Sequence, residues 1–432
     1  KCERLLMRKL LLVLTLMIAN FMVIASPNDY LIKPTGSYKV SMQEFLWQNS
    51  NICPDYFYDK ADNWFYQNNP LHCHVVDTYI YYPTTTMSNN YDSYWAKNIV
   101  ELNHDIKDKI IESKNLSAAY NVKQLMFDQK SYVISQQNIA KGKFPVLIFQ
   151  PGLGFNSYNY LNFISNLVSH GYIVVAIDSA YNQNIIESYG TLGLHIPQSH
   201  NGKMSSSSAA AVVAAKKSNL TLALSDYKFV LNKLKTDNRL RSLTSHMDFS
   251  KIGGFGHSLG STSIYINSLE SSNVLKGYVS LDIGSSNDLP IHVYNPVIPT
   301  LFLRAANDRD FGKTIDTTNQ FNLIENQYLA LMTPFESDIS YSTHRAFTDV
   351  STTYYGNNLI NLWYNVYGQP DINLAEFMYS DHINGQDLSK SINQYLLVFF
   401  DNYLKNVNSV SLKECHSLNP NSILYCGPKI IQ

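Results

Sequence analysis

The feature that most constrains this chain is a serine placed between glycines, where a short apolar segment gives way to a helix-compatible one. Gly256-His257-Ser258-Leu259-Gly260 has the pattern G-x-S-x-G, which marks a nucleophile elbow when a strand precedes it and a helix follows. Lys251 to Phe255 is short and strand-like, and Ser261 to Leu269 can form a helix. The sharp turn leaves no room for side chains beside the serine, hence the glycines. We interpret Ser258 as an exposed nucleophile, in preference to a surface serine in a glycine-bounded turn.

The composition is that of a large folded protein. The chain has 432 residues, 45% of them hydrophobic and 16% charged, so it can bury a large core. A formal net charge of -1 gives no reason to expect nucleic acid or an anionic membrane as a partner. The 31 tyrosines and 20 phenylalanines indicate a large core with amphipathic surfaces, which is compatible with apolar substrates.

Residues 1–25 have the features of a signal peptide. Met7, the expected true start, begins a basic segment that precedes an apolar run, and Val23 and Ala25 occupy the -3 and -1 positions of a small-residue cleavage site. An uncleaved anchor is disfavoured because the apolar run is short and Asn20 interrupts it. We therefore expect an exported protein, either secreted or periplasmic.

Four cysteines remain after the signal peptide, and an even number in an exported protein suggests disulfides. The simplest pairing joins Cys53 with Cys73 and Cys415 with Cys426, although three pairings are open. No second cluster with ligand spacing accompanies His72-Cys73-His74. We therefore expect no metal and no cofactor.

The domain organisation is simple. Residues 26–78 are rich in Asn, Asp and Tyr with little periodicity, which predicts an irregular N-terminal leader. Residues 79–432 are predicted to form a single domain with an insertion at 181–218. Val75 to Tyr82 is predicted as the first strand, and Asn98 to Leu116 as a peripheral helix.

Strands and helices alternate from Lys143 onwards. Phe144 to Phe149 and Tyr172 to Ile177 are apolar runs of the kind found in buried parallel strands, and a helix is predicted between them. This alternation predicts an α/β fold with a mostly parallel central sheet and helices on both faces. Further strands are predicted at Gly277 to Leu281, Pro299 to Leu303 and Tyr328 to Met332, and helices at Asn159 to Ser169, Leu220 to Leu234 and Ser391 to Leu404.

A serine nucleophile needs a base to take its proton and an acid to orient that base. In elbow hydrolases the acid and then the histidine follow the serine, each after a later strand. His344 follows the predicted last strand and is preferred as the base to His382, which lies before the final helix; His292 and His416 are less suitably placed.

The acid and the oxyanion hole have candidates as well. Asp282 follows one predicted strand, and Asp308 or Asp310 follows the next. Elbow hydrolases most often take their acid from the later strand, which favours Asp308. The oxyanion donors are expected to be the backbone N-H groups of Leu259, after the nucleophile, and of Leu153, in the glycine-rich loop after Phe149.

Several segments resemble the plasma and type II platelet-activating-factor acetylhydrolases of the α/β-hydrolase superfamily. The resemblance covers roughly residues 143–404 and rests on FPVLIFQPGLG, NLVSHGYIVVAID, KIGGFGHSLGS, GYVSLD and STHRAFTD. It implies an α/β-hydrolase fold with Asp282 as the acid and His344 as the base, with Phe347 and Asp349 at the family's spacing. Pro151 stands where the family often has histidine, and residues 181–218 and the loop before His344 do not match closely.

The resemblance implies a secreted, calcium-independent serine esterase. Its substrates would be phospholipids with short or oxidised sn-2 acyl groups, or lysophospholipids, and it would touch a membrane or micelle surface transiently. The alternative is a general carboxylesterase or a cutinase-like polyesterase, because AANDRD resembles the acid segment of the latter. A non-catalytic binding protein of the same fold is disfavoured, since all three triad residue types are present in order.

Overall fold

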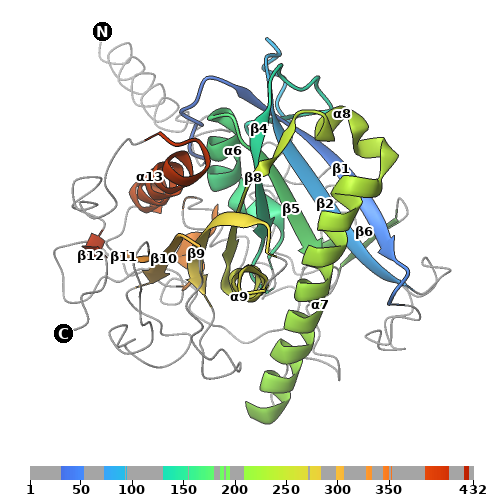
Figure 1. Ribbon diagram of the computed structural model, residues 1–432, viewed down its shortest axis with the longest axis vertical. Coiled ribbons are helices and arrows are strands. Elements are labelled where there is room, and N and C mark those ends of the chain that lie inside the picture. The colour runs from blue at the N-terminus through green and yellow to red at the C-terminus, as the bar shows by residue number, and fades with distance from the viewer. Residues whose placement is uncertain are drawn as a thin grey trace, which may run out of the picture.

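The fold is built on one long twisted sheet (Figure 1). The computed structural model describes residues 31–52, 73–92, 94, 130–153, 155–179, 185–188, 191–194, 209–270, 273–283, 298–305, 327–332, 344–349, 352, 385–407 and 423–427. Within them the main sheet has ten strands in the order β12-β11-β10-β9-β8-β4-β5-β2-β1-β3. The strands are β1 (Lys39–Asn49), β2 (His74–Thr84), β3 (Val133–Ser135), β4 (Phe144–Gln150), β5 (Ile173–Ser179), β8 (Met247–His257), β9 (Leu275–Ile283), β10 (Thr300–Ala305), β11 (Gln327–Met332) and β12 (Ile423–Gly427).

The centre of the sheet is parallel and its margins are mixed. β5, β4, β8, β9, β10 and β11 pair in parallel with their neighbours, whereas β2 is antiparallel to both β5 and β1, and β12 is antiparallel to β11. The predicted mostly parallel sheet is therefore confirmed. Parallel strands all end at one edge, and this edge carries the site described below.

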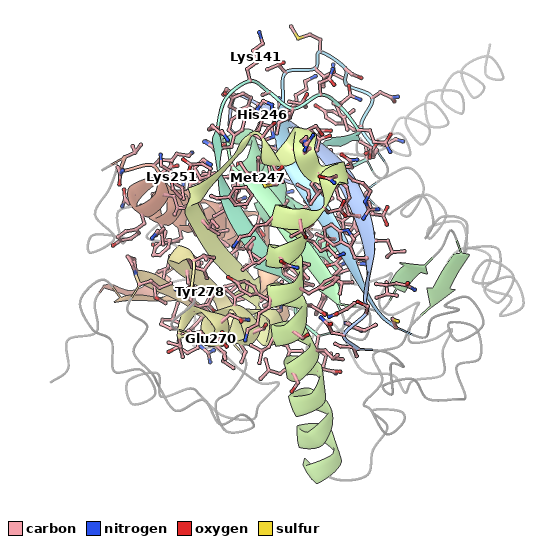
Figure 2. All side chains as sticks on the ribbon, turned by 45° about the vertical axis from the view of Figure 1, so that its right-hand side comes forward. Lys141, His246, Met247, Lys251, Glu270 and Tyr278 are labelled. Carbon is pink, nitrogen blue, oxygen red and sulfur yellow. The ribbon has the colours of Figure 1, made fainter. Side chains whose placement is uncertain are left out.

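Helices cover both faces of the sheet, as expected. In Figure 1, α6 (Leu161–Ser169) and α13 (Gly385–Leu404) lie together, away from α9 (Ser258–Ser268) and α7 (Ala209–Thr236). Figure 2 shows α7 running across the front of the sheet and past α9. The remaining short elements are α8 (Arg241–Thr244), η1 (Ser157–Tyr160), η2 (Asn238–Leu240), η5 (His344–Phe347) and a hairpin of β6 (Ile185–Ser188) and β7 (Thr191–Leu194).

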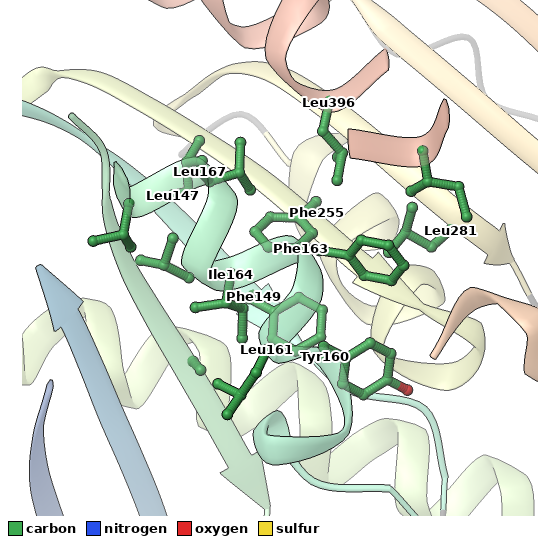
Figure 3. Packing of buried hydrophobic residues seen from close by; sticks show 14 of the residues in the cluster. Leu147, Phe149, Tyr160, Leu161, Phe163, Ile164, Leu167, Phe255, Leu281 and Leu396 are labelled. Atoms are coloured by element: carbon green, nitrogen blue, oxygen red, sulfur yellow. The ribbon is translucent and has the colours of Figure 1, made fainter. Parts of the chain in front are cut away.

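Strand β4 shows why both faces must be covered. Every residue of this strand is buried, because side chains alternate between the two faces. Leu147 and Phe149 pack against the α6 and α13 side, and Val146 and Ile148 pack against the α7 and α9 side. Figure 3 shows the first of these cores, in which Leu147 and Phe149 meet α6 and residues of β8, β9 and α13.

The N-terminal segment differs from its expected irregular structure. Residues 39–49, inside the supposed leader of residues 26–78, form strand β1, which pairs with β2 along its whole length from Lys39 opposite Thr84 to Asn49 opposite His74. The strand was not predicted because Ser41, Gln43 and Glu44 interrupt the alternation of apolar and polar residues. Ser41 is nevertheless fully buried. Its hydroxyl donates to the carbonyl of Ile134 across the sheet at 2.6 Å.

The insertion at 181–218 contains the β6–β7 hairpin and the first turns of α7, which begins at Ala209. The expected signal peptide, the helix at Asn98 to Leu116, and the residues Asp308, Asp310 and His382 lie outside the described residues. So do Cys53 and Cys415, so the expected disulfide pairing stays a prediction. Among the helices that the structure describes, none combines the length and the apolar character needed to cross a membrane.

Candidate active site

The predicted site residues come together where the central strands end. β4 ends at Gln150 and leads into the loop with Leu153, while β8 ends at His257, directly before Ser258. β9 carries Asp282 as its penultimate residue, and Ser258 makes a parallel bridge with Ile283. The elbow serine therefore lies beside the end of β9, one residue from the candidate acid.

The elbow has the strained geometry that its sequence predicts. Ser258 has φ = 51°, in the left-handed region that costs a non-glycine residue roughly 1–2 kcal/mol. The flanking glycines are required by close packing, because a Cβ on Gly260 would lie 2.2 Å from the Gln150 carbonyl oxygen and one on Gly256 would lie 2.7 Å from the Ser261 nitrogen. The elbow is thus packed closely against the loop that follows β4.

The two residues expected to supply the oxyanion donors, Leu153 and Leu259, lie after β4 and β8. Leu259 is in the first turn of α9, where backbone N-H groups have no partner within the helix. In the other loop, the N-H of Gly152 donates to the Tyr160 hydroxyl at 3.0 Å, so this amide is already used. Leu153, the residue expected to supply the oxyanion donor of this loop, comes next. Its side chain joins that of Leu259 in a small apolar cluster with Leu220, Leu224 and Ile266.

The candidate acid and base are in direct contact. His344 begins η5, and its Nδ1 lies 2.6 Å from Oδ2 of Asp282. Asp282 is fully buried, with φ = 48°, and accepts a second hydrogen bond from the Ala305 N-H at 3.0 Å. The structure therefore brings together the acid and the histidine that the family resemblance indicated. The rivals Asp308 and His382 are outside the described residues.

A buried arginine holds the charge on Asp282. The Nε of Arg304 lies 3.4 Å from Oδ1 of Asp282, both side chains are nearly inaccessible, and an Arg304 Nη1 donates to the Ile283 carbonyl. Burial alone would raise the pKa of Asp282. The positive charge of Arg304 and the hydrogen bonds from His344 and Ala305 outweigh burial and lower this pKa to about 2. The acid is therefore ionised at any pH at which the histidine could act as a base.

Two further buried carboxylates bind the segment that follows the loop after β4. Asp178, near the end of β5, accepts hydrogen bonds from the N-H and hydroxyl of Ser157 at 2.9–3.0 Å. Asp349 accepts from the backbone N-H groups of Leu161 and Asn162 at the start of α6, at 2.6 and 3.0 Å. A carboxylate at a helix N-terminus satisfies donors that have no other partner. Asp349 thus ties the η5 segment, which begins at His344, to α6.

Asp349→Asn should reduce the pH dependence of stability. Burial raises the pKa of Asp349 to about 7, despite hydrogen bonds from the Asn162, Leu161 and Tyr94 groups. The pKa of Asp349 is higher in the folded than in the unfolded protein. The stability that Asp349 contributes is therefore fully present below about pH 4 and is lost as the pH rises through 7. A pKa moved from 3.8 to about 7 corresponds to roughly 4 kcal/mol.

Urea unfolding at about pH 5 and pH 8 measures this effect. The free energy of unfolding should fall less between the two values in Asp349→Asn than in the wild type. Asp387→Asn, which removes a half-exposed carboxylate on α13, is the matched control and should keep the wild-type slope. Equal slopes in all three proteins would contradict the prediction.

Three buried polar residues around this site were not predicted from the sequence to have a role in it. Arg304 contacts Asp282, and Asp349 binds the backbone N-H groups at the start of α6. His257, the variable position of the elbow, contacts both Tyr160 and the backbone of His344. Asp349 was noted only for its spacing from His344. In the part of the chain that the structure describes, no group of three or more His, Cys, Asp or Glu side chains is arranged to hold a metal ion.

Comparison with known proteins agrees with this fold. Residues 36–193 match the family model of platelet-activating factor acetylhydrolase, isoform II. A solved structure, the ferulic acid esterase from Streptomyces cinnamoneus, superposes with a TM-score of 0.57 over 88% of this chain and 94% of its own, at 15% sequence identity. The chain has an α/β-hydrolase fold. A search of curated proteins gives no significant match.

The family match extends the resemblance towards the N-terminus of the chain. It begins at residue 36, upstream of residue 143 where the sequence resemblance was expected to begin, and so includes β1 and β2. It ends before Ser258. The assignment of the nucleophile, acid and base therefore depends on the contacts described above.

Proposed function

We propose that this protein is a carboxyl-ester hydrolase that works through Ser258, His344 and Asp282. The observation that carries the proposal is the 2.6 Å contact between His344 Nδ1 and Asp282, beside a strained elbow serine. Nδ1 donates to the carboxylate, which leaves Nε2 as the lone-pair nitrogen that can take a proton. The similarity to platelet-activating factor acetylhydrolase, isoform II, supports an ester as the substrate.

The reaction follows from these positions. His344 Nε2 takes the proton of Ser258 as Oγ attacks the acyl carbonyl, and the ionised Asp282 stabilises the imidazolium. The Leu153 and Leu259 N-H groups bind the oxyanion. His344 then gives the proton to the leaving alcohol, which breaks the ester bond and leaves an acyl group on Ser258. Water, activated by the same histidine, releases the acid.

We propose short or oxidised sn-2 acyl groups of phospholipids, or the acyl group of lysophospholipids, as the substrates. Support comes from the family match and from the apolar cluster of Leu153, Leu259, Leu220 and Leu224. Two of its members carry the proposed oxyanion donors, so an acyl chain bound there would meet aliphatic side chains.

A general carboxylesterase is the second candidate. The observation that favours it is the similarity, over 94% of that chain, to a protein described as a ferulic acid esterase. An enzyme of this kind would hydrolyse simple esters with no requirement for a phospholipid head group.

Hydrolysis of three esters separates these candidates. Purified protein, with chelator present, is offered an sn-2 acetyl phospholipid, its long-chain counterpart and an aryl acetate. Preference for the acetyl phospholipid by tenfold or more in kcat/KM is expected. Equal or faster hydrolysis of the aryl ester would support the general esterase, and absence of hydrolysis together with no labelling by a fluorophosphonate probe would overturn both.

We also propose that the protein is exported. The basic start at Met7, the apolar run and the small residues Val23 and Ala25 support cleavage after residue 25. An oxidising destination would allow Cys53 to pair with Cys73, and Cys415 with Cys426. Sequencing the N-terminus of the exported protein and mapping its disulfides by peptide mass spectrometry test both statements.

A further inference from the structure

A buried chain of hydrogen bonds links the three segments that carry the proposed chemistry. The Gly152 N-H contacts the Tyr160 hydroxyl at 3.0 Å, this hydroxyl lies 2.8 Å from His257 Nδ1, and His257 Nε2 lies 2.9 Å from the backbone carbonyl oxygen of His344. Tyr160 and His257 are completely buried. The chain therefore runs from the oxyanion loop, through the residue before the nucleophile, to the backbone of the base.

The His344 carbonyl fixes the direction of one hydrogen bond, and a neutral His257 ring fixes the direction of the other. The carbonyl of His344 can only accept, so His257 must carry its proton on Nε2. A neutral ring then offers a lone pair at Nδ1, and the Tyr160 hydroxyl donates to it. The same hydroxyl oxygen accepts from the Gly152 N-H. Burial raises the pKa of Tyr160 well above its usual range, which keeps the hydroxyl proton in place.

The packing around His257 leaves this arrangement little freedom. A Cβ on Gly152 would lie 2.7 Å from His257 Nδ1, so the loop touches the ring. The rings of His257 and His344 lie 4.6 Å apart at 35°, and Phe347 stacks on His257 with a centroid separation of 6.4 Å. Movement of the His257 ring would therefore disturb the oxyanion loop and the base together.

We propose that His257, with Tyr160, is a positioning residue for the ester hydrolysis proposed above. It sets the distance between the Leu153 N-H, the Ser258 hydroxyl and the His344 imidazole. Asp282 orients His344 through its ring, whereas His257 holds the same residue through its backbone. This inference rests on the proposed function. It adds to that function the side chain that holds the loop after β4 and the His344 segment at a fixed distance from each other.

Substitutions can remove each link separately. Tyr160→Phe deletes the hydroxyl and keeps the ring. His257→Gln retains an N-H that can reach the His344 carbonyl, and His257→Asn retains an oxygen that can accept from Tyr160. His257→Phe removes both links. Tyr172→Phe is the matched control, because its hydroxyl donates to Asp401 at 2.6 Å, far along the chain from the site.

The number of active sites is titrated with a fluorophosphonate, and kcat per active site and KM are then measured. The inhibition constant of a trifluoromethyl ketone, which forms a tetrahedral adduct with the serine, is measured as well. For Tyr160→Phe and His257→Phe, kcat should fall about 10- to 100-fold with KM nearly unchanged, and ketone binding should weaken by a similar factor. The kcat values of His257→Gln and His257→Asn should lie between those of His257→Phe and the wild type. The Tyr160→Phe and His257→Phe effects should not add, because they break the same chain.

A merely structural role predicts something else. In that case Tyr160→Phe would lower the melting temperature and the active-site titre, as is also expected of Tyr172→Phe, with kcat per titrated site within twofold of the wild type. That result would overturn the proposal.

Nitrogen NMR of the His257 ring tests the proposal without any turnover. At neutral pH the wild type should show a neutral ring protonated at Nε2, with faster amide exchange at Gly152 in Tyr160→Phe. The opposite tautomer would overturn the hydrogen-bond chain even if the enzyme is active. If the wild type hydrolyses no ester but shows the expected tautomer, the failure lies with the proposed function.

Discussion

Replacing Ser258 with alanine is expected to lower kcat for ester hydrolysis by about 10⁵- to 10⁶-fold, because the variant has no atom that can attack the acyl carbonyl. The fold should be retained. Alanine keeps the Cβ and adopts the φ of 51° at no greater cost than serine, so only the hydroxyl is lost. Loss of turnover with an unchanged melting temperature would be the signature of the nucleophile.

Ser263→Ala is the matched control for this measurement. Ser263 lies on the same helix α9, is fully buried, and its hydroxyl has no hydrogen-bond partner among the described residues. Removing that hydroxyl should leave kcat unchanged and should not destabilise the protein. Undiminished hydrolysis by Ser258→Ala, measured with protein free of contaminating esterases, would remove the serine from the mechanism.

The parts of the fold that could be predicted from sequence are those whose signal is local. β4 and β5 are continuous apolar runs, and α13 repeats apolar residues at helical spacing, so each segment reveals its own burial. The elbow could be recognised for the same reason. Its strand, its glycines and its helix lie within about twenty residues, so the whole motif is visible in one short segment.

The parts that could not be predicted depend on partners far away in the sequence. β1 is a strand because it pairs with β2 and β3, although its polar residues obscure the alternation. Arg304 would be assigned to a surface on composition alone, yet it is buried against Asp282, which precedes it by more than twenty residues. His257 is equally unremarkable in sequence, because its two partners lie 87 and 97 positions away.

The choice between Asp282 and Asp308 illustrates the same limit. Strand order favoured Asp308, since the acid of elbow hydrolases most often follows the later strand, and only the family resemblance pointed to Asp282. In the structure, Asp282 has a left-handed φ of 48°. This backbone conformation turns the end of β9 so that the carboxylate meets the His344 ring, a geometry that no local pattern indicates.

Asp282→Asn is expected to lower kcat by about 10⁴-fold. The amide has no charge to stabilise the His344 imidazolium, and its NH₂ group can meet Nδ1 only if that nitrogen gives up its proton. The ring is then held in the tautomer whose Nε2 carries a proton and cannot act as a base. The substitution also leaves Arg304 buried without its counter-ion, so a lower melting temperature is expected as well.

Turnover divided by the folded fraction, measured by circular dichroism, separates the two effects, because it counts only folded molecules. Asp308→Asn is the matched control, an equivalent substitution at the rival position, and should keep kcat within about twofold of the wild type. A large loss in Asp308→Asn with near-normal turnover in Asp282→Asn would transfer the role of the acid to Asp308. Asp282 would then serve to neutralise Arg304, and its contact with His344 would be a consequence of that burial.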